Sequence, residues 1–175
     1  MELGDQIIDF RLKGTDGEFH SLKEYADKKV IAVVFSCNHC PYVIASEREL
    51  VALQSEFGPK GFQLIAINSN EDKNYPQDSF EEMVRRAKEK GFNFPYLRDE
   101  TQEVAKAYGA GRTPEFFIFD EHHKLRYHGR INDNPREHDK ITRHDAREAI
   151  AALLEGRDIE VPITNPIGCS IKWWS

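Results

Sequence analysis

Two kinds of apolar pattern follow one another early in the chain and predict a strand and then a helix. Val30–Phe35 is a continuous apolar run rich in β-branched residues, which is typical of a strand buried on both faces of a sheet. After Pro41 the apolar residues recur at steps of three and four, as in a helix: Val43, Ile44, Leu50, Leu53 and Phe57. Phe62–Ile67 is a second buried strand, and this order predicts a parallel βαβ unit.

Shorter patterns fill in the rest of one α/β domain. The further elements expected are a hairpin of Ile7–Leu12 and Glu18–His20, helices over 79–90 (capped by Asp78), 101–108 and from Thr142 or Asp145 to Leu154, a short strand at 94–97, and a hairpin of Glu115–Phe119 and Leu125–Gly129. The sequence contains no internal repeat and no composition break that would indicate a second domain.

The turn between the first strand and its helix contains the main candidate chemistry. Cys37 and Cys40 are separated by two residues, and Pro41 suits the first turn of the helix. Free N–H groups and the helix dipole stabilise a thiolate there, so its pKa falls below the usual value of about 8.5. Two thiols at this spacing can also form a disulfide. We therefore predict a dithiol/disulfide exchanger, with Cys37 exposed and acidic and Cys40 resolving the mixed disulfide.

Composition and charge narrow the range of partners. The 175 residues carry a net charge of -6 and no basic patch interleaved with aromatic residues, which argues against nucleic acid. The apolar runs are too short to span a bilayer, and Met1–Asp5 lacks a signal-peptide pattern, so we expect a cytosolic protein without a membrane partner. Three cysteines are too few for a disulfide scaffold, which leaves redox or metal chemistry.

With these motifs placed, the sequence resembles the thioredoxin-like superfamily, in particular its peroxiredoxin-like branch related to the alkyl hydroperoxide reductase and thiol-specific antioxidant proteins. The CNHCP motif at a strand–helix turn, together with Thr113-Pro114 before a strand, makes the resemblance specific. It covers roughly residues 4–156. It implies a three-layer fold with a central mixed sheet, helices on both faces and an N-terminal hairpin extension, as a domain over 1–156 with a tail over 157–175 packing on it.

The resemblance also implies roles for Thr113 and Pro114. Pro114 would be cis and face the cysteines, keeping metals away from them, and Thr113 would lend its backbone to an incoming substrate chain. No bound cofactor is implied, and a dithiol protein such as thioredoxin would reduce the enzyme again.

Three departures from the pattern matter. Ser36 replaces the aromatic residue that precedes the first cysteine in thioredoxin. The strand before it has no acid, so no base for Cys40 can be named. Val34 stands where a peroxiredoxin needs Thr or Ser, although Arg112 is near the position of that family's peroxide-polarising arginine.

Thiol–disulfide exchange with a protein or small disulfide is therefore the main hypothesis. The alternatives are a peroxiredoxin-like hydroperoxide reductase that uses Cys37 or Cys40 with Arg112, and a non-catalytic thiol or metal-binding module in which Cys169 and a histidine complete a zinc site. A monomer and a homodimer both fit the sequence.

Three further residues have two interpretations each. His39 is a loop residue or an imidazolium that stabilises a thiolate, and protein disulfide isomerases with such a histidine have potentials near -180 mV, against about -270 mV for thioredoxin. Cys169 is a buried small hydrophobe or a third redox thiol. Glu47 is a solvated side chain or a fallback proton carrier.

Overall fold

The computed structural model describes residues 1–175 and has one mixed sheet at its centre. Its strands are β1 (Arg11–Gly14), β2 (Phe19–Ser21), β3 (Val30–Ser36), β4 (Phe62–Asn68), β5 (Tyr96–Arg98), β7 (Glu115–Phe119) and β8 (Leu125–Gly129). They lie in the order β2-β1-β5-β4-β3-β7-β8, with β3, β4 and β5 parallel and the other pairings antiparallel. The βαβ unit and the hairpin of β7 and β8 are confirmed, and the N-terminal hairpin forms with its first strand at Arg11–Gly14 instead of Ile7–Leu12.

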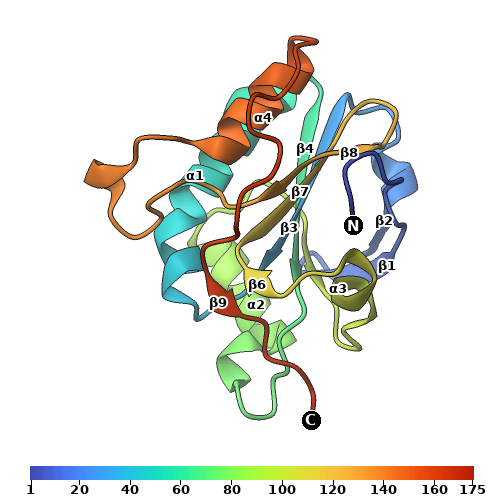
Figure 1. Ribbon diagram of the computed structural model, residues 1–175. Coiled ribbons are helices and arrows are strands. Elements are labelled where there is room, and N and C mark those ends of the chain that lie inside the picture. Colours follow the sequence, from blue (N-terminus) through green and yellow to red (C-terminus); the bar gives the residue numbers. More distant parts are fainter.

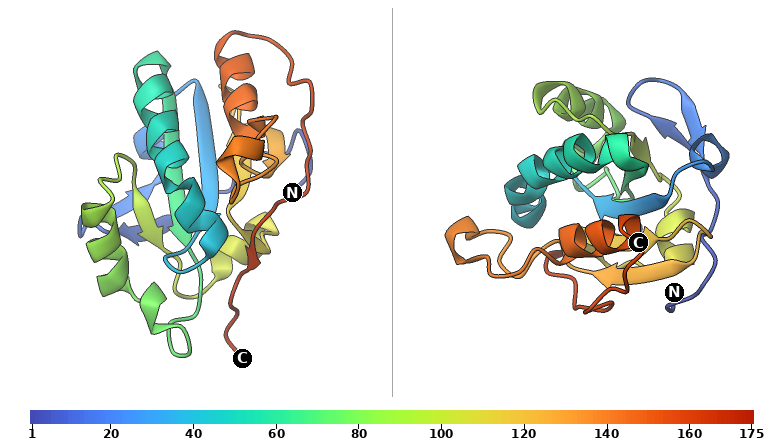
Figure 2. Two further views of the ribbon diagram at one scale, coloured as in Figure 1. Left: turned by 90° about the vertical axis from the view of Figure 1, so that its left-hand side faces the viewer. Right: turned by 90° about the horizontal axis from the view of Figure 1, so that it is seen from above.

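Helices cover both faces of this sheet (Figures 1 and 2). The four helices are α1 (Pro41–Phe57), α2 (Phe80–Glu89), α3 (Glu103–Tyr108) and α4 (Asp145–Leu154). Alternate residues of β3 enter two separate cores because successive strand side chains point to opposite faces. Val30, Ala32 and Val34 pack with α1, α2 and α4, whereas Ile31 and Val33 pack with α3 and the N-terminal segment. The predicted three-layer α/β fold is therefore confirmed.

Short 3₁₀ turns connect several of these elements: η1 (Leu22–Tyr25), η2 (Gly58–Lys60), η3 (Pro76–Asp78) and η4 (His138–Lys140). The η3 turn corrects one expectation, because Ser79 rather than Asp78 caps α2 by accepting the Glu82 N–H. Asp78 is fully buried, and its carboxylate bonds the backbone N–H of Asn38 instead of the helix. No helix combines the length and the apolar character needed to cross a bilayer.

A second, two-stranded sheet was not expected from the sequence. β6 (Arg112–Thr113) pairs antiparallel with β9 (Cys169–Ser170) from the tail, beside the lower end of the main sheet in Figure 1. The tail is attached along its length, through Thr164 to Tyr127 and β8, and through Lys172 to the loop after β4. It therefore reaches the end of β3 where the cysteines are.

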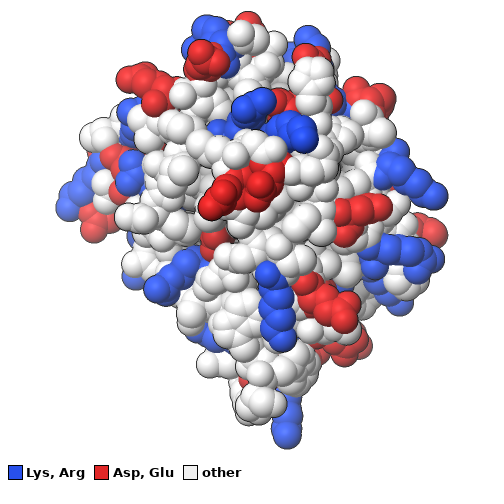
Figure 3. Space-filling view, turned by 45° about the vertical axis from the view of Figure 1, so that its right-hand side comes forward, with Lys and Arg blue, Asp and Glu red and all other residues white.

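The surface in Figure 3 carries acidic and basic side chains interspersed over the face shown. Neither sign forms a continuous field on this face. Long-range electrostatic attraction of a strongly charged partner is therefore not a property of this face.

Candidate active site

The cysteine turn connects β3 to α1 as predicted. Cys37 directly follows β3, Cys40 is the N-cap of α1, and Pro41 is its first residue. The Cys40 side chain is thus beside the first N–H groups of the helix, which have no partner within the helix. Contrary to expectation Cys37 is not exposed: its relative exposure is 2%, and that of Cys40 is 0%. Both sulfurs are covered in this state.

The Thr113–Pro114 bend lies directly against the two sulfurs. Its peptide bond is cis. Cys37 Sγ is 3.5 Å from Thr113 Oγ1, and Cys40 Sγ is 3.4 Å from the carbonyl oxygen of Thr113, close enough to donate when protonated. Buried Glu115 holds the segment before the bend by accepting the N–H groups of Gly111 and Arg112, each at 2.9 Å. One rigid turn therefore contacts both cysteines.

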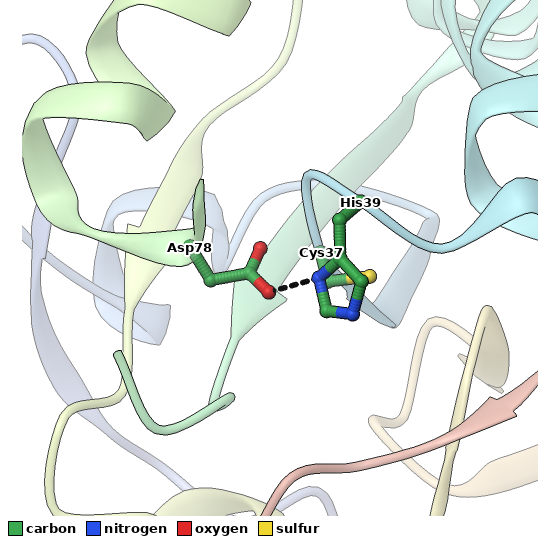
Figure 4. Close-up of side chains that lie close together, drawn as sticks. All are labelled: Cys37, His39 and Asp78. Atoms are coloured by element: carbon green, nitrogen blue, oxygen red, sulfur yellow. Dashed lines mark hydrogen bonds and ion pairs between the residues drawn. The ribbon is translucent and has the colours of Figure 1, made fainter. Parts of the chain in front are cut away.

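A buried carboxylate, missed in the sequence, fixes the cysteine turn from the other side. Asp78 accepts the backbone N–H of Asn38 at 2.6 Å and bonds Nδ1 of His39 (Figure 4). It also accepts amide N–H groups from Asn68 and Asn70 at 3.2 and 3.0 Å. Two of these four contacts hold the turn, and the other two fix Asp78 to the end of β4 and the segment after it. Asp78 has the position of a helix cap in the sequence, and the adjacent Ser79 fills that role.

His39 lies at the outer edge of the site. Its ring stacks on Tyr75, with centroids 5.3 Å apart, and its side chain is 23% exposed. Donor atoms of Cys37, His39 and Asp78 all lie within 4.8 Å of one another (Figure 4). The imidazole is therefore next to Cys37, as the sequence argument requires, but its Nδ1 is already bonded to Asp78.

The two cysteine thiols have unequal acidity. The hydrogen bond from Cys37, a further one from the Cys169 thiol and the backbone N–H of Val43 lower the pKa of Cys40 to about 4. The pKa of Cys37 is raised well above its ordinary value, first because its thiol donates to Cys40, and further by burial and by the nearby charge of Asp78. The two thiols therefore share a proton, and the directions of their pKa shifts favour the negative charge on Cys40. The expectation that Cys37 is the acidic thiol stays a prediction.

Cys169 is the third sulfur of the cluster. Strand β9 places it opposite Thr113, and it packs against Cys37 and Cys40. Burial first, and then the hydrogen bond to Cys40, raise the pKa of Cys169 to about 11. Gly168 permits the approach, because an added Cβ would lie 2.0 Å from the Thr113 carbonyl oxygen. The tail therefore occupies the backbone edge of Thr113 to which the resemblance assigned substrate binding.

Glu47 and Arg112, the two other candidate residues, make their hydrogen bonds to residues other than the cysteines. Glu47 is not solvated: it is 5% exposed and forms a bidentate ion pair with Arg86, at 2.5 and 2.7 Å. That pairing raises the pKa of Arg86 and engages both carboxylate oxygens of Glu47. Arg112 is exposed on β6, with its backbone rather than its side chain engaged by Glu115.

Metal binding by this cluster would use Cys37, His39 and Asp78, the set whose donor atoms lie together. Thiolate, imidazole and carboxylate are all zinc ligands, and a structural zinc site needs four. Asp78 already accepts four hydrogen bonds, so coordination would require it to give up partners that hold the cysteine turn.

Two adjacent thiols at a helix N-terminus, faced by a cis-proline bend on a mixed sheet, are the arrangement of thioredoxin-like redox proteins. The chain belongs to the Redoxin family, whose model matches residues 2–150. That match covers the whole main sheet and all four helices except the last part of α4.

Individual proteins similar to this chain carry names from two kinds of thiol chemistry. "Thiol-disulfide oxidoreductase ResA" of Halalkalibacterium halodurans is 29% identical over 122 residues, which are 70% of this chain and 65% of that protein. A Helicobacter pylori protein named as a peroxiredoxin, bcp, is 28% identical over 110 residues, 63% of this chain and 67% of that protein. An uncharacterized conserved protein of Geobacillus kaustophilus has a crystal structure with a TM-score of 0.93 and 44% identity, covering 99% of this chain and 93% of that one.

Proposed function

We propose that this chain is a thiol–disulfide oxidoreductase that cycles Cys37 and Cys40 between dithiol and disulfide. The observation that carries the proposal is the pair of cysteines packed together at the start of α1, with both sulfurs in contact with Thr113 of the cis-proline bend. A thiolate is the attacking species in disulfide exchange, and an acidic thiol is also the better leaving group. The ResA relative and the Redoxin match support the same chemistry.

The exchange runs in two steps. The proton shared between the sulfurs moves from Cys37 to Cys40, and the Cys37 thiolate attacks one sulfur of the substrate disulfide, releasing the other as a thiolate. Cys40 then loses its proton and attacks Cys37 Sγ, which releases the substrate's second sulfur and leaves the Cys37–Cys40 disulfide. Cys37 is the first to meet the substrate because His39 beside it is the exposed edge of the site.

Substrate access requires the tail to move. Cys169 packs against both sulfurs, and β9 is held to β6 over only two residue pairs. Separation of so short a strand is a local opening of the kind that costs far less than global unfolding. The released edge of Thr113 would then accept the backbone of a substrate chain. A dithiol protein such as thioredoxin would return the electrons.

A reductase assay with a small fluorescent disulfide tests the proposal. We expect turnover by the full chain with dithiothreitol as reductant, and its loss in Cys37→Ser and in Cys40→Ser. The matched control is His122→Ser, an exposed hairpin residue remote from the site, which should leave turnover unchanged. Turnover that persists in both cysteine variants would overturn the proposal.

Hydroperoxide reduction is the second candidate, favoured by the bcp relative. Two observations count against it as the main activity: the position for a Thr or Ser before Cys37 holds buried Val34, and the Arg112 side chain is exposed. Stopped-flow oxidation by hydrogen peroxide separates the two. A peroxidase reacts orders of magnitude faster than a free thiol, and we expect only the slow reaction.

A further inference from the structure

The tail brings a third cysteine to the redox pair by an arrangement that a merely structural residue would not need. β9 is the last strand of the chain, and its pairing puts Cys169 opposite Thr113. Thr113 is also the residue whose hydroxyl and carbonyl contact Cys37 and Cys40. Three sulfurs, two from the β3–α1 turn and one from the tail, therefore lie close to one residue.

Cys40 is close to both other thiols. The thiols of Cys37 and Cys169 both lower the pKa of Cys40, and Cys169 packs against the cluster that contains Cys37 and Cys40. A disulfide is cleaved by a thiolate that approaches one of its sulfurs opposite the bond to be broken. Cys169, which packs against the cluster that contains Cys40, is the neighbouring thiol that could attack Cys40 once Cys37 and Cys40 are joined.

The tail is attached so that this contact is kept. Gly168 lets the backbone approach Thr113, and Ile171 is buried and donates its N–H to the carbonyl of Gly111 at 2.9 Å. Further along, the Lys172 N–H donates to Asn70 Oδ1 at 2.9 Å, and the same Asn70 side chain donates to Asp78. Asn70 therefore contacts both the carboxylate that fixes the cysteine turn and the tail just beyond the strand that carries Cys169.

We propose that Cys169 is a third redox thiol that takes over the disulfide from Cys37 by exchange at Cys40. The Cys169 thiolate attacks Cys40 Sγ, the Cys40–Cys37 bond breaks, and Cys37 leaves as a thiolate that takes up the proton given by Cys169. One disulfide is formed and one broken, so no oxidant is consumed. This inference rests on the proposed function, because that function supplies the starting disulfide.

The exchange has a chemical purpose in this structure. Cys169 is partly exposed, whereas Cys37 and Cys40 are buried. Moving the disulfide to Cys40–Cys169 presents a reachable sulfur to the reducing thiol, with Cys40 as the leaving group. It also returns Cys37 to the free thiol.

The experiment maps disulfides in the full chain equilibrated with oxidised and reduced glutathione, trapped by acid, alkylated and analysed by mass spectrometry. We expect both Cys37–Cys40 and Cys40–Cys169 in the wild type, and only Cys40–Cys169 in Cys37→Ser. Cys40→Ser should form neither, nor a Cys37–Cys169 bond. The matched control is the double variant Cys169→Ser/Ser170→Cys, which keeps three thiols and the tail but turns the sulfur to the other face of β9. It should form only Cys37–Cys40, and its re-reduction should be several-fold slower than that of the wild type.

The outcomes separate the two proposals. A wild type that forms Cys37–Cys40 and turns over while Cys169 is always alkylated would overturn the relay and leave the proposed function standing. Restored re-reduction in the double variant would overturn it as well. Absence of Cys37–Cys40 at every glutathione ratio would instead overturn the proposed function.

Discussion

Replacing Gly168 with alanine should release the tail from the redox pair. The added Cβ would lie 2.0 Å from the Thr113 carbonyl oxygen and 2.6 Å from its carbon, both backbone atoms that cannot turn aside. β9 therefore has to move off β6, and Cys40 loses the hydrogen bonds it receives from Cys169. A hydrogen bond to a charged group contributes about 1.5–3 kcal/mol. If one hydrogen bond is lost and water replaces the other contacts of the Cys169 thiol, the pKa of Cys40 should rise by about one to two units from its value of about 4.

The assay is a titration of thiolate absorbance near 240 nm on the reduced protein, with the iodoacetamide reactivity of Cys40 followed in parallel. Gly168→Ala should titrate at the higher pH, and Cys40 should become more reactive because its cover is removed. Gly111→Ala, just before the partner strand β6, is the matched control, since its added Cβ would meet nothing within 4 Å. If Gly168→Ala kept the wild-type titration and the wild-type protection of Cys40, or if Gly111→Ala shifted both as much, the coupling between tail and thiolate would be refuted.

Three further perturbations test other parts of the site. Asp78→Asn keeps the size of the buried side chain but places an amide group opposite hydrogen-bond donors, so the free energy of unfolding in denaturant should fall by about 1–3 kcal/mol. The pKa of Cys37 should also fall, because the neighbouring negative charge is gone. An unchanged midpoint of unfolding would contradict this prediction. Glu47→Ala leaves the mostly buried Arg86 without its ion-pair partner, and the free energy of unfolding should fall by about 2 kcal/mol. This loss is smaller than for a fully buried pair because the Arg86 side chain is 20% exposed. A loss below about 0.5 kcal/mol would mean that the ion pair is not formed. Because the pKa of Cys40 is lower in the folded reduced protein than the value of about 8.5 in the unfolded chain, it stabilises the folded state above about pH 8.5, and this stabilisation is lost as the pH falls through about 4. Subtracting the pH profile of unfolding free energy of Cys40→Ser from that of the wild type should isolate this contribution. A difference that does not vary between pH 8 and pH 4 would exclude a buried thiolate.

The order of strands and helices was accessible from the sequence because it depends on local periodicity. The run after Lys29 became β3 within one residue of its predicted end, and Glu115–Phe119 and Leu125–Gly129 became β7 and β8 with the predicted limits. A strand buried on both faces has few alternatives. The meeting of Thr113 with the cysteines could be predicted only through the family resemblance, because no local pattern records that contact.

Long-range polar contacts were the part that sequence reasoning missed. Asp78 has the sequence signal of a helix cap, and its burial depends on amides of Asn68 and Asn70 that the fold brings to it. Glu47 was expected in solvent because its partner Arg86 is 39 residues away on another helix. The pairing of β9 with β6 could not be predicted because two-residue strands have no periodicity.

The reduction potential of the Cys37–Cys40 couple tests the central claim most directly, measured by equilibrating the full chain with glutathione buffers and counting free thiols. Because Cys40 is held as a thiolate in the reduced form, that form is stabilised, and we predict a two-electron transition at a potential less negative than the value of about -270 mV of thioredoxin. A potential at or below that value would contradict the stabilised thiolate. No transition at any ratio would contradict a redox centre formed by these two cysteines.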